Sequence, residues 1–167
     1  MESFQESVDE YRKQLEKGAI VKAYRGLLEY MMQLRTYFQR NYPDYYVSGS
    51  IYYGFMDMTY FSFSPKPIRD RKLKIAIVLI HDKCRFEAWL AGANKQVQQK
   101  YWKLFFESDW GKFDVVPTTE GVDSIVETVL VDNPDFNALD RLTKQIESAA
   151  LTFIDDIENF LSENRSS

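Results

Sequence analysis

The sequence is poor in the residues on which many metal centres and secreted folds depend. Among its 167 residues there is one cysteine, Cys84, and one histidine, His81. A single cysteine excludes a disulfide framework and a cysteine metal cluster within one chain, and a single histidine excludes the zinc motifs built on pairs of histidines. We therefore predict no metal site and no cofactor.

Long apolar runs are missing as well. The longest extends from Ile75 to Ile80, far short of the roughly 20 residues that a membrane helix needs. The first six residues, Met-Glu-Ser-Phe-Gln-Glu, hold no basic segment followed by an apolar one, so we expect no signal peptide and no membrane contact. These observations predict a cytoplasmic protein.

The composition is that of a globular chain. Hydrophobic residues make up 45% and charged residues 28%, with seven glycines and five prolines, so the chain is neither disordered nor fibrous. Its length predicts a single domain over residues 1–167. Aromatic residues are abundant, with 3 Trp, 11 Tyr and 12 Phe, and they predict a core built on rings.

Charge is distributed unevenly along the chain. The net charge is −4, yet residues 1–106 hold 17 basic against 11 acidic residues, and residues 107–167 hold 4 against 14. Either the acidic part covers a basic surface of the rest, or the basic part holds an anion site. The overall negative charge makes nucleic acid an unlikely partner.

Helical periodicity occupies both ends and the middle of the chain. Ser3 and Glu6 match a capping box, and Gly18 separates the first helix from a second that extends to about residue 40, so we expect a helical hairpin. Asn94 is placed to cap a mid-chain helix that ends near residue 107. Asn133-Pro134 is placed to open a long C-terminal helix that ends near residue 161.

Strand-like segments lie between these helices. They are predicted over residues 46–52, 56–63, 73–81, 85–91 and 124–131, where β-branched and aromatic residues dominate. Residues 64–71, which contain two prolines, and residues 108–123 are predicted as loops. The short connections favour an α+β fold with a mostly antiparallel sheet of four to five strands.

The best-defined pair of strands predicts two different faces. A two-residue turn at Asp82-Lys83 sets a register in which one face is apolar throughout, carrying Leu73, Ile75, Ile77, Leu79, Phe86, Ala88 and Leu90. His81 lies at the end of this face, and its imidazole is predicted to form a structural hydrogen bond and not to act as a catalyst. Cys84 is predicted to be a buried small hydrophobe.

The other face of the same pair holds the candidate site. Arg85, Glu87 and Trp89 project from it in line over an apolar floor. The helix that follows adds Asn94, Lys95 and Gln98 at the rim, and Trp102 two turns further on. Polar groups that converge between apolar and aromatic walls are typical of a ligand pocket, here for a small anionic or planar ligand. The alternative is a structural Arg85–Glu87 pair beside a buried tryptophan.

Three segments carry a resemblance to a known family. They are residues 57–63, residues 73–82 and residues 85–102, the last with Trp89 and Trp102. They resemble a family of single-domain bacterial proteins that consist of a domain of unknown function, over nearly the whole length. The resemblance implies a bacterial origin and assigns no activity.

The order of elements is also similar to the core of restriction-endonuclease-like folds. That similarity implies a divalent metal held by acids, for which Asp82 and Glu87 are the candidates. The lysine of the family motif would follow Glu87 by two residues, where this sequence has Trp89 instead, and Lys95 is the nearest substitute. The resemblance rests on topology.

Three functions remain open from the sequence. A binding or interaction protein, as a monomer or a homodimer, is favoured because no nucleophile–base pair is evident. A divalent-metal-dependent nuclease is the second. A small-molecule enzyme that uses Arg85 as an anion clamp and Glu87 as an acid or base is the third.

Overall fold

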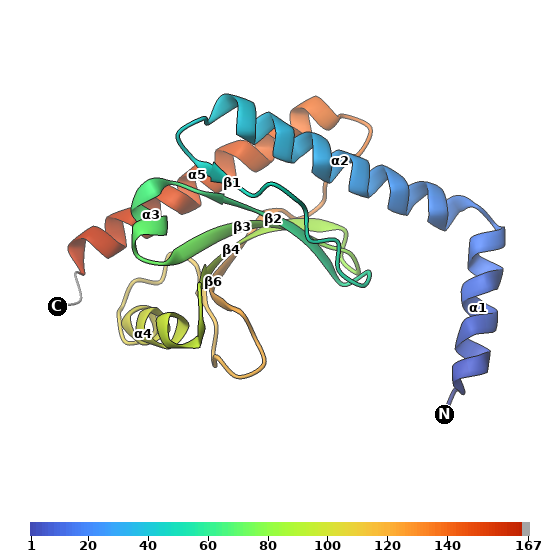
Figure 1. Cartoon of the computed structure of the whole chain (residues 1–167), viewed down its shortest axis with the longest axis horizontal. Helices are drawn as coiled ribbons and strands as arrows, with labels where there is room; N and C mark the ends of the chain where they lie inside the picture. Colours follow the sequence, from blue (N-terminus) through green and yellow to red (C-terminus); the bar gives the residue numbers. More distant parts are fainter. Residues whose placement is uncertain (165–167) are drawn as a thin grey trace.

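A computed structural model describes residues 1–164 and shows an α+β fold (Figure 1). Its helices are α1 (Phe4–Glu16), α2 (Ala19–Asn41), α3 (Lys66–Asp70), α4 (Lys95–Phe106) and α5 (Leu139–Glu163). Its strands are β1 (Tyr46–Val47), β2 (Met58–Ser64), β3 (Leu73–Ile80), β4 (Arg85–Gly92), β5 (Asp114–Val115) and β6 (Ser124–Val131). The predicted fold class is confirmed.

The strands form one sheet in the order β1-β2-β3-β4-β6-β5, with every pair antiparallel. It has one strand more than predicted, because β5 lies in a segment predicted as a loop. The first predicted strand keeps only residues 46–47. After it the chain leaves the sheet and returns for a single bridge between Tyr52 and Tyr60, which is consistent with Gly49 and Gly54 in this segment weakening a strand.

The main core lies on one face of the sheet, where α2 and α5 pack side by side (Figure 1). All seven residues predicted for the apolar face of β3 and β4 are buried there. Phe38 of α2 and Phe153 of α5 are fully buried against them. The strong alternation along β3 and β4 therefore identified the core face correctly.

The register between β3 and β4 is the predicted one, with Ile77 opposite Ala88 and Ile80 opposite Arg85. The connection is longer than predicted, because neither strand includes residues 81–84. Cys84 has a φ of 47° and is exposed, so the prediction of a buried cysteine is wrong. The structural interpretation of His81 is confirmed, since its Nε2 lies 2.7 Å from the hydroxyl of Thr59.

Two other predictions at helix ends need correction. Residues 64–71 are not simply a loop, because α3 forms within them with Pro65 at its N-cap and Pro67 in its first turn, where proline is tolerated. Helix α5 begins at Leu139 and not at Asn133-Pro134. The Asp135 carboxylate accepts a hydrogen bond from the backbone of Asn137 at 2.9 Å, and this turn delays the helix.

The first helix does not form the predicted hairpin with the second. Gly18, with a φ of 81°, makes an elbow, and α1 projects away from the rest of the molecule (Figure 1). The capping box of Ser3 and Glu6 is present as predicted, but α1 contains no buried residue. Among the described residues, no helix is both long and apolar enough to cross a bilayer.

Candidate ligand pocket on the open face of the sheet

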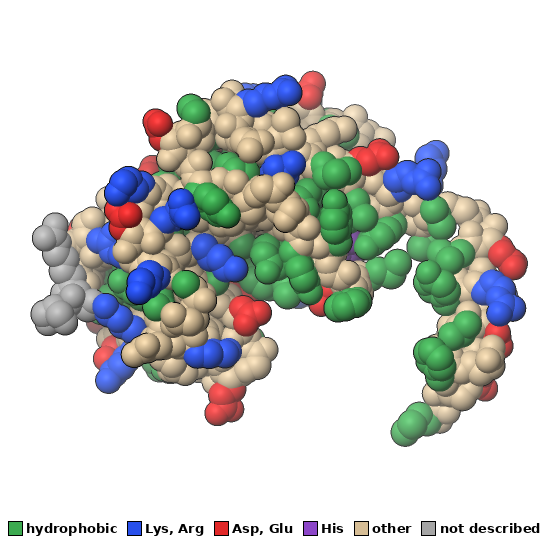
Figure 2. Space-filling model, viewed as in Figure 1, with side chains coloured by type: hydrophobic (Ala, Val, Ile, Leu, Met, Phe, Trp, Pro, Cys, Tyr) green, Lys and Arg blue, Asp and Glu red, His purple; other side chains and the backbone are tan. Residues whose placement is uncertain are grey.

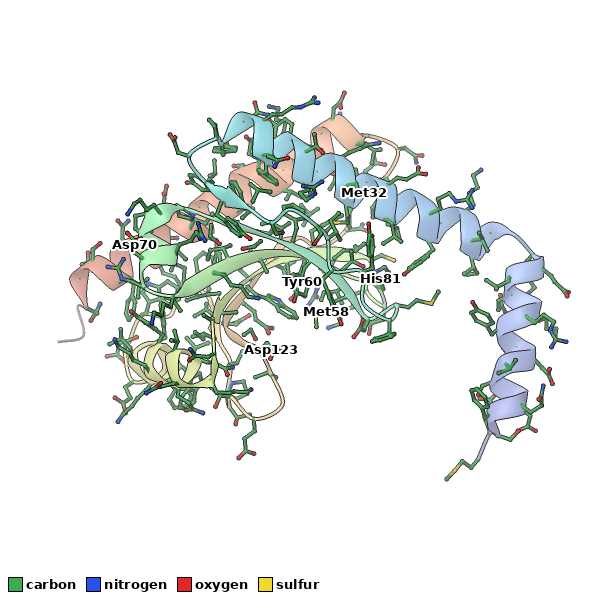
Figure 3. The ribbon with its side chains drawn as sticks, in the orientation of Figure 1. Met32, Met58, Tyr60, Asp70, His81 and Asp123 are labelled. Atoms are coloured by element: carbon green, nitrogen blue, oxygen red, sulfur yellow. The ribbon has the colours of Figure 1, made fainter. Side chains whose placement is uncertain are left out.

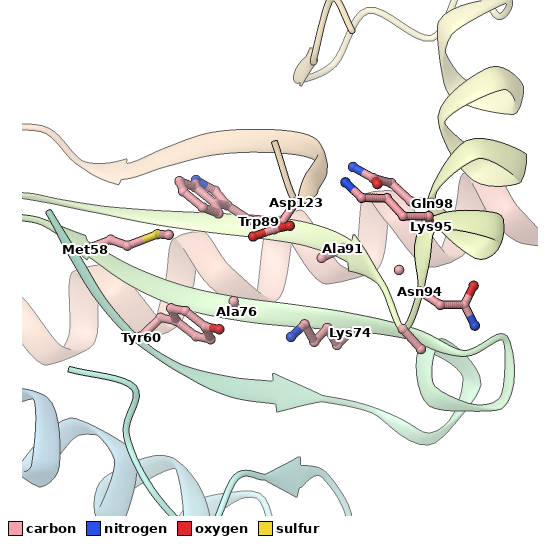
Figure 4. Close-up of a pocket in the computed structure, with 12 residues that line it drawn as sticks. Met58, Tyr60, Lys74, Ala76, Trp89, Ala91, Asn94, Lys95, Gln98 and Asp123 are labelled. Carbon is pink, nitrogen blue, oxygen red and sulfur yellow. The ribbon is translucent and has the colours of Figure 1, made fainter. Parts of the chain in front are cut away.

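The face of the sheet opposite α2 and α5 is called the open face here. Figure 3 places Met58, Tyr60 and Asp123 on this side. A pocket of about 340 Å³ lies on it, where the ends of β3 and β4 meet the start of α4 (Figure 4). Its lining is Met58, Tyr60, Lys74, Ala76, Trp89, Ala91, Gly92, Ala93, Asn94, Lys95, Gln98 and Asp123.

Small side chains create the hollow. Ala76 lies directly opposite Trp89 in the β3–β4 register, and Ala91 lies opposite Lys74. Because alanines stand where large residues would fill the face, the floor of the pocket is close to the backbone. The larger side chains of Tyr60 and Trp89 then form walls on either side of this floor (Figure 4).

The rim carries two cations and one anion. Lys74 and Lys95 supply the ammonium groups and Asp123 supplies the carboxylate. Within residues 1–164, neither lysine forms an ion pair. Lys95 Nζ donates a hydrogen bond to the carbonyl oxygen of Val122 at 3.4 Å, and Lys74 Nζ lies 5.6 Å from the ring centroid of Tyr60. An ammonium group has three N–H donors, so each lysine can still bind an anion. Burial raises the pKa of the Tyr60 phenol, which therefore stays protonated at neutral pH.

The first turn of α4 closes one end of the pocket. The Asn94 side chain caps the helix by accepting from the backbone of Val97 at 2.9 Å, as the sequence predicts. Gln98 is buried, and its amide donates to the carbonyl oxygens of Val122 at 2.9 Å and Ser124 at 3.3 Å. These bonds hold α4 against the start of β6 and fix the position of the rim.

Gly92 allows this close approach, and its replacement gives a testable effect. A Cβ at residue 92 would lie 2.6 Å from the backbone nitrogen of Gln98. We expect Gly92→Ala to push α4 outward and to lower the free energy of unfolding by about 1–3 kcal/mol. Gly49→Ala is the matched control, because a Cβ there meets nothing within 4 Å. Urea unfolding of both variants measures the difference, and equal values would contradict this packing.

The predicted Arg85–Glu87–Trp89 line forms a connected network beside the pocket. Glu87 is only 5% exposed, and its two carboxylate oxygens accept from Arg85 Nε at 2.7 Å and from Trp89 Nε1 at 2.8 Å. Arg85 Nη1 also reaches Asp132 at 3.4 Å. The hydrogen bond with Glu87 raises the pKa of the Arg85 guanidinium further above its ordinary value. Of these three residues, Trp89 alone lines the pocket.

The structure thus gathers four of the seven candidate residues at the pocket, namely Trp89, Asn94, Lys95 and Gln98. Arg85 and Glu87 lie nearer the start of β4 and outside the pocket lining, and Glu87 contacts the pocket residue Trp89 through its hydrogen bond. Trp102 lies elsewhere, because its Nε1 donates to the carbonyl oxygen of Val116 at 2.7 Å and its ring stacks on Phe106.

Comparison with known proteins gives a family but no activity. The family model described as a domain of unknown function, DUF7000, matches residues 4–161. The chain belongs to the DUF7000 family. No curated protein and no solved structure matches it.

Sequence reasoning missed several residues of the pocket. Tyr60 and Met58 alternate along β2 toward the open face, and this signal becomes readable once β2 is known to pair with β3. The alanines of the floor stand out because their neighbours on β3 and β4 are larger. Asp123 carries no such signal, since it lies in the loop directly before β6.

The residues proposed for a metal are separated from one another in this DUF7000 chain. Asp82 is exposed in the turn between β3 and β4, whereas both oxygens of Glu87 already accept hydrogen bonds. Lys95 lies beyond the opposite end of β4, at the start of α4. The arrangement does not favour the nuclease hypothesis over a binding pocket.

Proposed function

We propose that this protein binds a small, planar, anionic ligand in the pocket between Tyr60, Trp89 and the first turn of α4. The observation that carries the proposal is an oriented indole beside two ammonium groups that form no ion pair within residues 1–164, over a floor of alanines. Pockets of this kind combine apolar walls with a few polar groups that fix orientation.

The ligand's shape follows from the walls. The rings of Tyr60 and Trp89 flank the floor formed by Ala76 and Ala91, and an aromatic or conjugated plane can stack on such rings. A volume of about 340 Å³ lies at the lower end for ligand pockets and suits a metabolite-sized molecule.

The ligand's charge follows from the rim. Lys74 and Lys95 contribute two positive charges against the single negative charge of Asp123. A carboxylate or phosphate would accept charge-assisted hydrogen bonds from the two ammonium groups. Asp123 can accept a hydrogen bond from an N–H or O–H group of the same ligand.

Arg85 and Glu87 contribute as positioning residues. Glu87 fixes the indole of Trp89, and Arg85 neutralises the nearly buried carboxylate. This assignment differs from a direct clamp by Arg85, because the guanidinium is already committed to Glu87 and Asp132.

We place the protein in the cytoplasm. The support is Cys84, whose thiol is exposed in the turn between β3 and β4. An exposed free thiol is suited to a compartment in which thiols are kept reduced.

The test is a binding screen with planar anions, using nucleoside monophosphates and aromatic carboxylates as probes. Binding is measured by tryptophan fluorescence and by the shift in Tm, with Trp89→Phe identifying the fluorescence that comes from the pocket. We expect Lys74→Gln with Lys95→Gln to weaken the binding of a hit at least tenfold, since each charge-assisted hydrogen bond contributes about 1.5–3 kcal/mol.

The matched control is Lys83→Gln with Lys103→Gln, which removes the same charge from exposed positions outside the pocket. Equal loss of affinity in both double variants would show a general charge effect and contradict the pocket. Failure of every planar anion to bind would refute the proposed ligand class.

A further inference from the structure

Helix α1 is an arm whose apolar stripe is largely exposed within the described chain. Phe4, Val8, Tyr11 and Leu15 follow a helical spacing along one side. None of them is buried, and Phe4 and Tyr11 are 86% and 58% exposed. Figure 2 shows hydrophobic side chains along the side of α1 that faces the rest of the molecule.

A helix of this length needs a partner to be stable. It has 13 residues, and isolated helices of that size are marginal in water, because packing of the apolar face supplies most of a helix's stability. The capping box of Ser3 and Glu6 helps only the first turn.

The body of the molecule presents a second apolar surface across the gap from α1 (Figure 2). It is formed by residues 52–56, where Phe55 is 90% exposed and Tyr52, Tyr53 and Met56 are each more than two-fifths exposed. The Tyr53 hydroxyl lies 3.9 Å from the sulfur of Met32, so this surface is continuous with the side of α2.

The apolar stripe of α1 is complementary to itself when two copies run antiparallel. The steps between successive members are four, three and four residues, so the pattern reads the same in both directions. In an antiparallel pair, Phe4 of each copy lies opposite Leu15 of the other, and Val8 lies opposite Tyr11. A parallel pair would set Phe4 against Phe4 and leave the shorter Val8 against Val8.

Charge supports the same orientation. The first ten residues contain four acidic residues and no basic one, whereas residues 11–17 contain three basic residues and one acidic residue. An antiparallel pair sets the acidic half of each helix beside the basic half of the other. At the 8–10 Å between packed helix axes, such charges still interact at physiological ionic strength.

We infer that the apolar stripe of α1 packs against the same stripe of a second copy of this chain. The protein then forms a two-fold symmetric dimer through antiparallel α1 helices. The N-terminal end of each arm then lies at the elbow of the other copy, in the gap bordered by residues 52–56. The interface is isologous and closes at two copies. It is independent of the ligand pocket, so the two proposals fail separately.

The first experiment measures the mass of the full chain by sedimentation equilibrium, in reducing buffer to exclude disulfides through Cys84. We expect the wild type to sediment at twice the mass of one chain and Phe4→Gln with Tyr11→Gln to sediment at the mass of one. Phe106→Gln with Phe136→Gln is the matched control, because it makes the same kind of change at exposed aromatic side chains outside α1, and it should remain a dimer.

Near-UV circular dichroism of each variant reports the core, which should be unchanged because α1 buries no residue of its own. A wild type that is monomeric over the micromolar range would overturn the proposal. So would a dimer that survives Phe4→Gln with Tyr11→Gln.

The second experiment tests the orientation, in a Cys84→Ser background. Chains with Phe4→Cys are mixed with chains with Leu15→Cys and oxidised. We expect disulfide-linked dimers in the mixture and none from Phe4→Cys chains alone. Efficient linkage of Phe4→Cys chains to each other would show parallel arms and overturn the antiparallel register.

Discussion

Replacing Phe38 with alanine is expected to lower the free energy of unfolding by about 3–5 kcal/mol, the range for a buried phenylalanine. Phe38 is fully buried on α2, and its ring centroid lies 4.4 Å from that of Phe63 on β2. It also packs on Phe61 at 6.2 Å. The side chain therefore ties the helical layer to the sheet, and its removal leaves a cavity between two rigid elements.

Phe55→Ala is the matched control for this prediction, since the same atoms are removed from a side chain that is 90% exposed. Its effect should stay within about 0.5 kcal/mol. Guanidinium unfolding of both variants at the same protein concentration gives the comparison. A small loss for Phe38→Ala would mean that α2 is not anchored through this residue.

Replacing Glu87 with alanine is expected to cost about 2–3 kcal/mol of stability, because it leaves an indole N–H without its acceptor and a half-buried guanidinium without its main partner. The figure lies below the 3–5 kcal/mol of a fully buried pair, since the Arg85 side chain is 24% exposed and keeps Asp132.

Glu87→Gln separates the two roles of this residue. The amide keeps one acceptor oxygen, so we expect it to retain more stability than Glu87→Ala while orienting Trp89 less firmly. Urea unfolding measures the first effect, and the fluorescence anisotropy of the Trp89 indole measures the second. If Glu87→Ala unfolds no more easily than the wild type, the network does not contribute to stability.

Much of the fold could be predicted because alternation along strands is a strong signal. Large apolar residues occupy every second position along most of β3 and β4, with Lys74, Ala76, Arg85 and Glu87 among the residues between them, and a register slip would expose the whole core face. That constraint placed Arg85, Glu87 and Trp89 on the open face correctly. The predicted register of β3 and β4 is correct although the turn was predicted two residues too short. The two strands pair in the same register whether two residues or four connect them.

The full pocket could not be predicted, because it depends on contacts between elements distant in sequence. Met58 and Tyr60 join the site only because β2 pairs with β3, and Asp123 joins it from the loop before β6. Trp102 was included because it lies two turns after Lys95, yet the helix turns its ring toward Val116. Which side of a helix meets the sheet is decided by tertiary packing, and spacing alone does not show it.

The first helix shows a different limit of sequence reasoning. Its apolar stripe predicts a helix correctly, but a stripe does not say what it packs on. The elbow at Gly18 directs α1 away from α2, and a conformation with positive φ at a glycine between two helices allows either a hairpin or an open arm.

The sheet ends in very short strands on both sides, since β1 and β5 contain two residues each. At the β1 edge, the guanidinium of Arg69 also lies 4.0 Å from the ring centroid of Tyr46. Long, flat, uncharged edges recruit further chains and seed fibrils, whereas short edges that bear a cation resist this. In a chain with 16% aromatic residues, these two short ends therefore offer few backbone groups on which a further strand could be templated.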